Sequence, residues 1–501
     1  MEKSRSQNAK LNILLGYIAQ VGICILSFVG RKIFLRFLAV DYLGINGLYT
    51  NILTVMSLAE LGVDTAVVYS LYKPVADHDT KLIHSMIVYF RKIYWGLSIM
   101  ILAFGLLLIP FLKYLIKSDI PHNDLVFFYV LFLINTVASY FVAERVALLS
   151  AFQEQRIQKL VTLLFNLILQ IAYIVVLIVF HNYYAYVIAM VITTIMTTIA
   201  LGIITERRHP DIFKEKELID FDKKPVINRI KDTLLYKIGA VLINSTDNIL
   251  ISVLVSTAAV GLYGNYVTVV SAITAFITII TTSLIAGIGN LGVKEGKEKQ
   301  KDLFFMMVFV YHFVAALGLV GFSLLFNDLI AIWVGEEFAF DMKTVIIIAV
   351  NFYIPNAVSP VWMFREANGL FDDVKYLLLI RAALNLIFSV IFGMIWGVFG
   401  ILLATTVSML MTNFWFEPGL IFKKLFGTSA AKYWLVQLKY LLITAASFAV
   451  SVFVIRPLGD SLLMIGLKGG IIVIITTAFF VVTCFRSNEY KKLKGYLIRS
   501  R

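Results

Sequence analysis

Charged residues are scarce in this chain of 501 residues. Asp, Glu, Lys and Arg together make up 15% of it, whereas 60% is hydrophobic. A soluble protein would carry about 25% charge. Because so little polar surface cannot coat a water-soluble globule, lipid must solvate much of the outside. The apolar runs are ~20 residues or longer, which fits spanning helices and excludes a transmembrane barrel, whose strands need only ~10. We therefore predict an all-α polytopic membrane protein.

Cysteines and the common nucleotide- and metal-binding motifs are also rare or missing. Cys24 and Cys484 lie far apart in apolar runs, so neither a disulfide nor a metal site is implied. The sequence has no GxxxxGKS or GxxxxGKT phosphate loop and no HExxH zinc motif. We expect no cofactor, no metal site and no ATP-driven transport, and we expect a protein that is not an enzyme.

Fourteen apolar segments reach the ~20 residues that a helix needs to cross a bilayer. They cover residues 11–38, 45–72, 84–112, 123–149, 159–180, 184–204, 232–256, 260–288, 303–326, 343–368, 375–394, 397–420, 434–455 and 462–485. The segment 343–368 is interrupted by Pro355 and Pro360, and the segments 375–394 and 397–420 almost touch.

Lysine and arginine are concentrated in alternate connections between these segments. The connections 205–231 and 289–302 and both ends of the chain are rich in them, whereas the opposite set has few. Because positively charged loops are retained in the cytoplasm, we predict that both termini are cytoplasmic. The net charge of +13 then mostly reflects topology. We expect the basic loops to contact anionic lipid headgroups rather than nucleic acid.

One short pattern occurs twice, each time at the start of an apolar helix: GLYTN at 47–51 and GLYGN at 261–265. The matching surroundings indicate one unit built twice, which in a membrane protein is typical of a transporter. We predict two pseudo-symmetric six-helix lobes around a central cavity. The predicted parts are an N-lobe at 1–204, a basic cytoplasmic loop at 205–231, a C-lobe at 232–420, two further spans at 421–485 and a basic cytoplasmic tail at 486–501.

Two carboxylates, Glu60 and Asp64, fall near the middle of a predicted span. Ionisable groups inside a span are costly and normally face a cavity or a partner. Four residues apart, the two share one helix face, and both cannot be ionised cheaply in a low dielectric. Such a pair could carry a proton or a sodium ion. The alternative is that an arginine pairs with them and locks two helices together.

Two further polar sites lie at a similar depth. Asp247 stands beside Asn244, Ser245 and Asn248, a cluster that could either hold helices together or form part of a cation or sugar-hydroxyl site. His312 is alone on an apolar face. A histidine in that setting is more often a hydrogen-bonded packing residue than a proton relay.

Arginines also occur inside the predicted spans. Arg31, Lys32 and Arg36 lie toward the outer side of the first span, where positive residues are unusual. They could grip phosphate oxygens, or extend to the outer headgroups as ordinary anchors. Arg145 and Arg381 lie toward the inner side and leave the same two interpretations open.

The stretches RKIFLRFLAVDYLGINGLYTNILTVMSLAELGVDTAVVY (Arg31–Tyr69) and TDNILISVLVSTAAVGLYGNYV (Thr246–Val267) resemble bacterial polysaccharide flippases of the Wzx type. These belong to the multidrug/oligosaccharidyl-lipid/polysaccharide exporter superfamily. The resemblance covers essentially the whole chain. It implies movement of an undecaprenyl-diphosphate-linked oligosaccharide from the inner to the outer leaflet of the bacterial cytoplasmic membrane. The oligosaccharide would serve capsule, exopolysaccharide or teichoic-type polymer assembly, with polymer assembly enzymes as partners.

The resemblance further implies alternating access, coupled to a gradient of H⁺ or Na⁺, and a cationic cavity that holds the diphosphate. On this hypothesis Arg31, Arg36, Arg145 and Arg381 contact the diphosphate, and Glu60, Asp64, Asp247, Asn248 and His312 serve ion coupling or line the polar cavity. The alternatives are an exporter of lipid II or small molecules in the same superfamily, and a membrane-embedded glycan polymerase or ligase. An enzyme of that kind should have a long outer loop, and the longest one here, near 327–342, is short.

Overall fold

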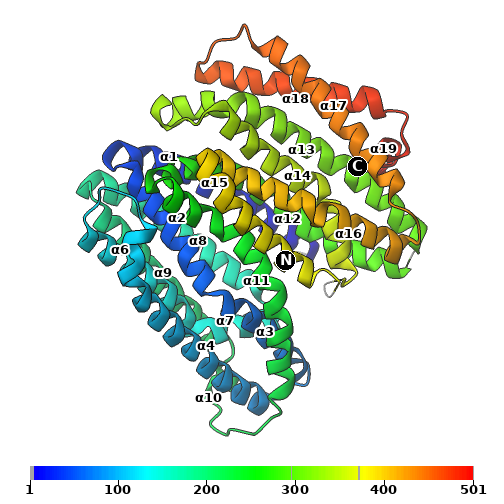
Figure 1. The fold of residues 1–501 in the computed structure, drawn as a ribbon. Helices are drawn as coiled ribbons and strands as arrows, with labels where there is room; N and C mark the ends of the chain where they lie inside the picture. Colours follow the sequence, from blue (N-terminus) through cyan, green and yellow to red (C-terminus); the bar gives the residue numbers. More distant parts are fainter. Residues whose placement is uncertain (1–4, 295, 371–372, 500–501) are drawn as a thin grey trace. The chain divides into compact units, whose positions relative to one another are not determined.

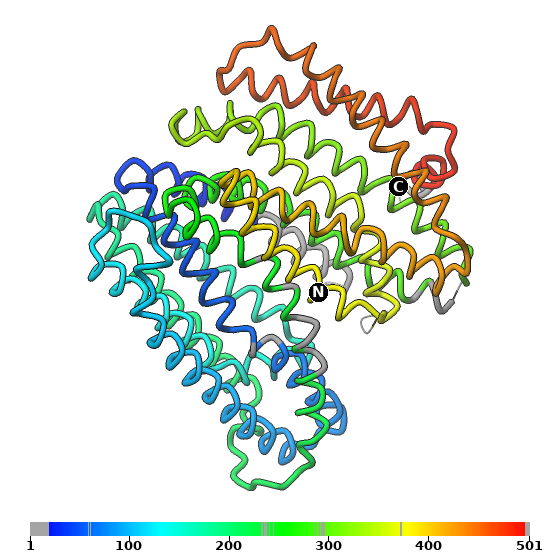
Figure 2. The backbone as a smooth tube through the Cα atoms, viewed as in Figure 1, coloured from blue at the N-terminus to red at the C-terminus, as the bar shows by residue number. Residues whose placement is uncertain are grey.

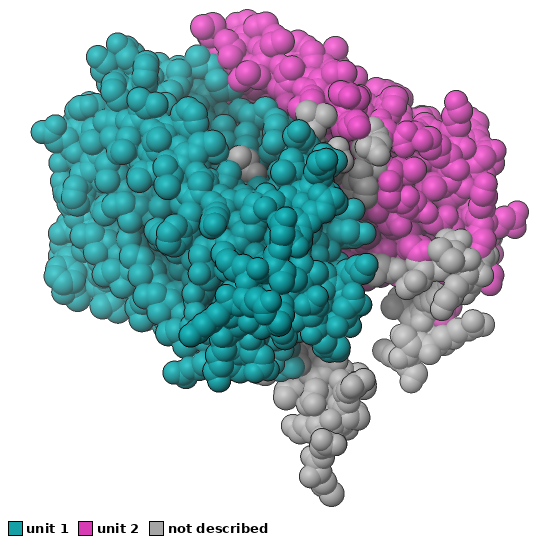
Figure 3. All heavy atoms as spheres, turned by 90° about the horizontal axis from the view of Figure 1, so that it is seen from below, with its two compact units in different colours: residues 1–261 teal, residues 262–501 magenta. Residues whose placement is uncertain are grey.

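The computed structural model describes residues 5–294, 296–370 and 373–499, and the side chains of these except at 5–19, 59, 61, 232–233, 235–237, 240, 244, 286, 290, 292–294 and 496–499. Every regular element among the described residues is a helix, and none of them forms a strand (Figure 1). This confirms the all-α class. The chain forms two units, residues 1–261 (unit 1) and 262–501 (unit 2), which Figure 3 draws in different colours.

Unit 1 is built from eleven α-helices, two 3₁₀ turns and the start of a twelfth helix. They are α1 (Arg5–Phe37), α2 (Val40–Met56), α3 (Leu58–Ala76), α4 (Thr80–Leu108), η1 (Ile109–Phe111), α5 (Leu112–Leu115), α6 (His122–Ser139), η2 (Tyr140–Val142), α7 (Ala143–Ala151), α8 (Gln155–Phe180), α9 (Tyr183–Arg208), α10 (Pro210–Lys214), α11 (Lys224–Leu254) and the first residues of α12 (Thr257–Lys294). Helix α11 packs against α2 and α3, α1 against α8, and α6 against α9 (Figure 2).

Two interruptions shape the middle of unit 1. Ser57 leaves the helical conformation with ψ 7°, which ends α2 and starts α3. The turn η2 interrupts another long apolar segment, between α6 and α7. Such breaks expose backbone groups, and within a membrane they are tolerated only where protein or a polar cavity surrounds them. Ser57 lines the pocket described below, and Tyr140 of η2 donates a hydrogen bond to Glu60 in its wall.

Unit 2 is organised around α13. Its elements are the rest of α12, α13 (Lys297–Trp333), η3 (Glu336–Phe338), α14 (Met342–Ala367), α15 (Lys375–Met411), α16 (Asn413–Ile421), the π-turn η4 (Phe422–Phe426), α17 (Ala431–Ile455), α18 (Leu462–Cys484) and α19 (Asn488–Arg499). Helix α13 packs against α14, α17 and α18. Phe304 on α13 lies fully buried among Phe364, Phe422 and Tyr433, so aromatic edges hold these helices together.

Ten stretches among the described residues are long and apolar enough to cross a membrane. One of them, Lys375–Phe426, has 52 residues. At ~1.5 Å rise per residue it is too long for one crossing. Gly397, the first residue of the predicted span 397–420, breaks it with φ 61°. The remaining predicted spans fall on α1, on α2 with α3, and on α11. The total of fourteen and the cytoplasmic termini stay predictions.

The division at Gly261 differs from the lobes that the repeat suggests, because α11 and the turn after it pack within unit 1. The starts of α2 and α12, which carry the two copies of the repeated pattern, cross at glycines. A Cβ atom on Gly44 would overlap the carbonyl oxygen of Thr257, and one on Gly261 would overlap that of Val40. Small residues at this crossing let the backbones touch. The lobe boundaries stay a prediction.

Candidate functional site

Unit 1 contains a partly open pocket of about 320 Å³ among α2, α3, α6, α9 and α11. Its wall consists of Thr50, Leu53, Thr54, Ser57, Glu60, Phe132, Asn135, Thr136, Met190 and Val241. The hydroxyls come from one face of α2 because Thr50, Thr54 and Ser57 are spaced by four and three residues. The break at Ser57 then brings Glu60 into the same wall. The pocket is therefore polar on the α2–α3 side, inside a chain that is mostly apolar.

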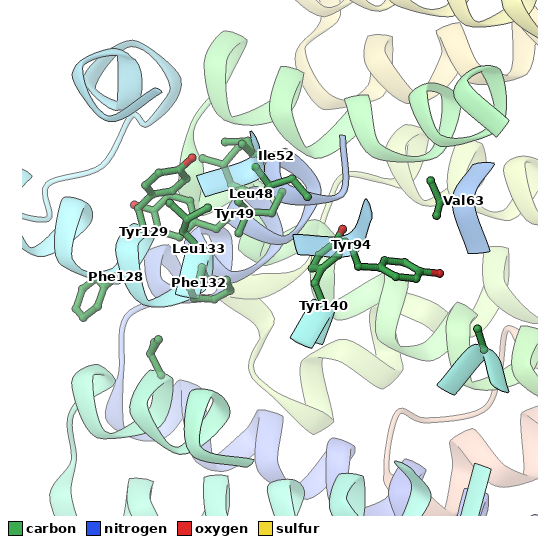
Figure 4. Close-up of a cluster of buried hydrophobic side chains, with 14 of the residues drawn as sticks. Leu48, Tyr49, Ile52, Val63, Tyr94, Phe128, Tyr129, Phe132, Leu133 and Tyr140 are labelled. Carbon is green, nitrogen blue, oxygen red and sulfur yellow. The ribbon is translucent and has the colours of Figure 1, made fainter. Parts of the chain in front are cut away.

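Glu60 and Asp64 lie on α3, and each accepts a hydrogen bond from a buried tyrosine. Tyr140 of η2 donates to Glu60, and Tyr94 of α4 donates to the Asp64 carboxylate over 2.5 Å. Figure 4 draws both tyrosines within the buried cluster of unit 1. The sequence analysis singled out the carboxylates but not the tyrosines. With 24 tyrosines in the chain, nothing local marks these two as partners.

A second charged cluster ties α4, α7 and α9 together. Glu144 is fully buried; the Arg91 Nε atom lies 3.0 Å and the Arg145 Nε atom 3.6 Å from its carboxylate. Arg145 also reaches Glu206 at 2.9 Å and lies over the ring of Phe213. Arg145 is thus held by two carboxylates, the arrangement expected of a structural arginine. One carboxylate oxygen of Glu144 is buried without a hydrogen-bond partner.

Arg31 and Arg36 on α1 occupy different surroundings. Arg31 is half-buried and interacts electrostatically with Tyr186, which stacks on Tyr173 with ring centroids 3.8 Å apart. Arg36 is exposed and lies 5.9 Å from the ring of Phe37. Five positions apart, the two guanidinium groups leave the helix in different directions.

Asp247 and Asn248 are half-buried on α11. The amide nitrogen of Asn248 lies 3.3 Å from where a Cβ of Gly47 would be, so the absent side chain at Gly47 lets α11 approach α2. The Asn248 carbonyl oxygen is buried without a hydrogen-bond partner. The side chain of Asn244, which the sequence analysis grouped with them, lies outside the described residues.

The last two predicted site residues belong to unit 2. His312 is fully buried on α13; its Nδ1 lies 2.8 Å from the Val308 carbonyl oxygen and its Nε2 lies 2.7 Å from Oε1 of Gln437. Two such contacts are typical of a packing histidine. Arg381 is half-buried on α15. The structure therefore brings Glu60 and Asp64 together, holds Arg145 in an ion-pair network, and divides the four arginines between the two units.

The described residues contain no group of three or more His, Cys, Asp or Glu side chains placed to hold a metal ion. What unit 1 does contain is a pocket with polar groups on one side, and two carboxylates four residues apart on α3, within a set of long apolar helices. Long apolar helices around polar and ionisable groups define a polytopic helical membrane protein with the features of a transporter.

Comparisons with known proteins agree with this class. Residues 10–286 match the sequence model of the polysaccharide biosynthesis protein family. Among solved structures, a lipid II flippase, MurJ, in an inward closed conformation superposes with a TM-score of 0.67 at 16% identity, covering 94% of this chain and 100% of that one. An inward-facing multidrug resistance MATE family transporter of the MOP superfamily gives 0.57 at 12% identity, with 79% and 96% covered. A MATE transporter of Vibrio cholerae gives 0.54 at 14% identity, with 82% and 95% covered.

No curated protein sequence matches the chain. At these identities the structural matches establish the fold, and the family match extends over more than half of the sequence. The chain belongs to the polysaccharide biosynthesis protein family. The resemblance found in the sequence is thereby confirmed at this level.

Proposed function

We propose that this protein is a flippase for undecaprenyl-diphosphate-linked oligosaccharide repeat units, moving them from the inner to the outer leaflet of a bacterial cytoplasmic membrane. The observation that carries the proposal is the polar, carboxylate-bearing pocket inside the spanning helices of unit 1, in a chain of the polysaccharide biosynthesis family. A lipid-linked glycan needs a polar path through the membrane for its sugars, while its lipid tail can stay in the bilayer. Capsule, exopolysaccharide or teichoic-type polymer would be the product that depends on it.

Arg31 and Arg36 are the proposed contacts of the diphosphate. A guanidinium group binds phosphate oxygens through two parallel hydrogen bonds, and α1 carries both residues at the end that the charge pattern predicts to face outward. Arg381 stays a candidate in unit 2. For Arg145 the ion pairs with Glu144 and Glu206 favour a structural role, because a diphosphate would have to compete with two carboxylates.

Glu60 and Asp64 are the proposed coupling groups, with H⁺ or Na⁺ as the ion. An ionised carboxylate only accepts hydrogen bonds, whereas a protonated one also donates. Protonation of either carboxylate would therefore weaken the hydrogen bond that it accepts from Tyr140 or Tyr94, because a neutral carboxyl group is a weaker acceptor, and would loosen the packing of α3 against η2 or α4. Asp247 and Asn248 on α11 and His312 on α13 are secondary candidates, and His312 is the weakest because both its ring nitrogens already have partners.

The first test is depletion of the protein in cells, followed by measurement of the amount and the leaflet of diphosphate-linked oligosaccharide. We expect single repeat units to accumulate on the inner leaflet and surface polymer to disappear. Single repeat units on the outer leaflet would instead indicate a polymerase or ligase. An unchanged pool would contradict the proposal and favour export of lipid II or a small molecule, the former being the cargo in the name of the MurJ structure.

The proposed contacts of Arg31 and Arg36 with the diphosphate can be tested separately. Arg31→Ala and Arg36→Ala should each abolish surface polymer while the protein still reaches the membrane, because the diphosphate loses a charged contact. Arg456→Ala is the matched control, since Arg456 is an exposed arginine at the end of α17. Normal polymer in both α1 variants would show that these residues are only headgroup anchors.

A further inference from the structure

Several polar groups in the wall of the unit 1 pocket act as hydrogen-bond acceptors. The hydroxyl of Thr54 donates to the Thr50 carbonyl oxygen over 2.7 Å, and that of Thr136 donates to the Phe132 carbonyl oxygen over 3.0 Å. With their protons turned back to their own helices, both hydroxyls can only accept from a ligand. Glu60 adds a carboxylate to the same wall. A ligand that suits this wall must bring many O–H or N–H groups.

Asn135 strengthens this argument. It lines the pocket from α6, and its carbonyl oxygen is buried without a hydrogen-bond partner. A buried acceptor that stays unsatisfied is destabilising, so such an atom beside a pocket is a position where a donor from a ligand gains the most. Acceptor oxygens thus come from α2, α3 and α6 at once.

The volume of the pocket indicates a ligand larger than a single ion. A bound cation draws its oxygen ligands to within about 2.3–2.6 Å, so a cation at Glu60 would fill only a small part of a space of about 320 Å³ and would leave room for a larger ligand. At ~30 Å³ for each water molecule, the space equals roughly ten waters. That is enough room for one six-membered sugar ring with its hydroxyl groups. Leu53, Phe132 and Met190 supply an apolar side against which the C–H face of such a ring can pack.

The negative charge of Glu60 limits the kinds of sugar that the pocket can bind. A phosphate or a carboxylate has oxygen acceptors and negative charge, so it would meet the Glu60 carboxylate and the acceptor oxygens with repulsion on both counts. A neutral sugar with free hydroxyls, or an amino sugar, meets neither difficulty. The same reasoning separates this pocket from the diphosphate contacts proposed on α1.

We propose that this pocket is a sugar subsite, which binds one neutral or amino sugar ring of the transported oligosaccharide and excludes uronic acids and phosphate. The inference rests on the proposed flippase function and specifies where one sugar of the cargo is held. Thr54, Thr136 and Asn135 accept hydrogen bonds from the ring hydroxyls, and Phe132 packs on the ring. Glu60, if it is also a coupling group, would then link the charge state of the site to the presence of the sugar.

The test uses the full chain in lipid nanodiscs and saturation-transfer NMR with single methyl glycosides: methyl glucoside, methyl galactoside, methyl N-acetylglucosaminide and methyl glucuronide, together with inorganic phosphate. We expect at least one neutral glycoside to bind, and methyl glucuronide and phosphate not to. The absence of binding by every neutral glycoside would overturn the proposal, as would a preference for methyl glucuronide or phosphate.

Isosteric variants locate the binding. Thr54→Val and Thr136→Val keep the shape of the side chain and remove one acceptor each, so each should weaken binding of the neutral glycoside about fivefold. Thr197→Val is the matched control, because the Thr197 hydroxyl also donates to its own helix, at Thr193 over 2.7 Å, but lies outside the pocket. Equal binding in all three variants would place the sugar elsewhere.

The same variants distinguish failure of the subsite from failure of the proposed function. In cells, the two pocket variants should slow the appearance of repeat units on the outer leaflet, whereas Thr197→Val should not. If depletion of the protein traps repeat units on the inner leaflet but all three variants flip normally, the flippase function holds and the sugar subsite is wrong. If depletion leaves the pool unchanged, the flippase function itself fails.

Discussion

The two units use the same kind of ion pair with very different exposure. In unit 2, Arg365 of α14 is 2% exposed and lies 2.8 Å from Glu417 of α16, which is 8% exposed. Asn413 also donates to Glu417, and Glu366 lies 2.8 Å from the other side of the guanidinium group. In unit 1, Arg145 of α7 is 21% exposed and Glu206 of α9 is 44% exposed.

In the predicted repeat, α7 and α9 of unit 1 correspond to α14 and α16 of unit 2. Each pair therefore joins the fourth and the sixth span of its predicted lobe. The Arg365–Glu417 pair in unit 2 is buried among other side chains. The pair in unit 1 is partly solvated and borders Glu144, whose second carboxylate oxygen lacks a hydrogen-bond partner. The buried pair in unit 2 should therefore be the costlier one to break, whereas the partly exposed pair in unit 1 can be separated at less cost.

The largest effect should come from breaking the buried pair. Glu417→Ala leaves the guanidinium group of Arg365 buried with less compensating charge, which should cost about 3–5 kcal/mol of unfolding free energy. Glu206→Ala in unit 1 should cost about 1 kcal/mol or less, because that carboxylate is largely solvated. Thermal unfolding of both variants in the same detergent measures the difference. Equal losses would remove the contrast between the units.

The next effect concerns the tyrosines that hold the carboxylates of α3. Tyr94→Phe removes the donor to Asp64 and should cost about 1.5–3 kcal/mol, since hydrogen bonds to charged groups are the stronger ones. Tyr311→Phe in unit 2 is the control. Its hydroxyl lies 2.5 Å from that of Thr281, a neutral partner, so about 0.5–1.5 kcal/mol is expected. The measurements are unfolding free energy and the ion dependence of flipping, and only Tyr94→Phe should alter the second.

A steric test compares glycines of the two units. Gly44→Ala places a methyl group on the carbonyl oxygen of Thr257 and should cost about 1–3 kcal/mol through a forced backbone shift. Gly419→Ala lies within α16, where nothing approaches within 4 Å. It should instead stabilise the helix by about 0.5–1 kcal/mol. Opposite shifts in the unfolding temperature are expected. A neutral result at Gly44 would show that the crossing of α2 and α12 is loose.

The sequence predicted the helical class and the shared face of Glu60 and Asp64, because both follow from local composition and spacing, and it indicated the family through the resemblance of two stretches to known flippases. It could not predict which groups meet these carboxylates, since Tyr94 and Tyr140 lie on other helices and tyrosine is common in the chain. Arg145 was left open between substrate and structure for the same reason: Glu144 is adjacent, but Glu206 comes from a distant helix. The pocket was missed because the threonines of α2 read as ordinary polar residues until the break at Ser57 is seen.

The smallest effect concerns the helix ends outside the spans, where each unit again has a matching ion pair. In unit 1, Glu154 lies between α7 and α8, and its carboxylate accepts hydrogen bonds from Arg208 at the end of α9 over 3.0 and 2.7 Å. In unit 2, Asp373 lies between α14 and α15, 2.6 Å from Lys424 of η4. The hydrogen bonds from Arg208, with His209 in support, hold the pKa of Glu154 below its ordinary 4.5.

A carboxylate with a lowered pKa stabilises the folded state above its ordinary pKa, and this stabilisation is lost as the pH falls through the lowered value. The contribution of Glu154 should therefore be complete above about pH 5 and should disappear only in stronger acid. Arg208→Gln removes the main cause of the shift, so the fall in unfolding temperature between about pH 5 and pH 3 should become shallower. Asp373→Asn breaks the matching pair of unit 2 and should leave the contribution of Glu154 to the slope in place. If Arg208→Gln leaves the slope unchanged, the acid sensitivity of unit 1 comes from its buried carboxylates instead. The contrast between the exposed ion pairs of unit 1 and the buried one of unit 2 would then rest on Glu60, Asp64 and Glu144 alone.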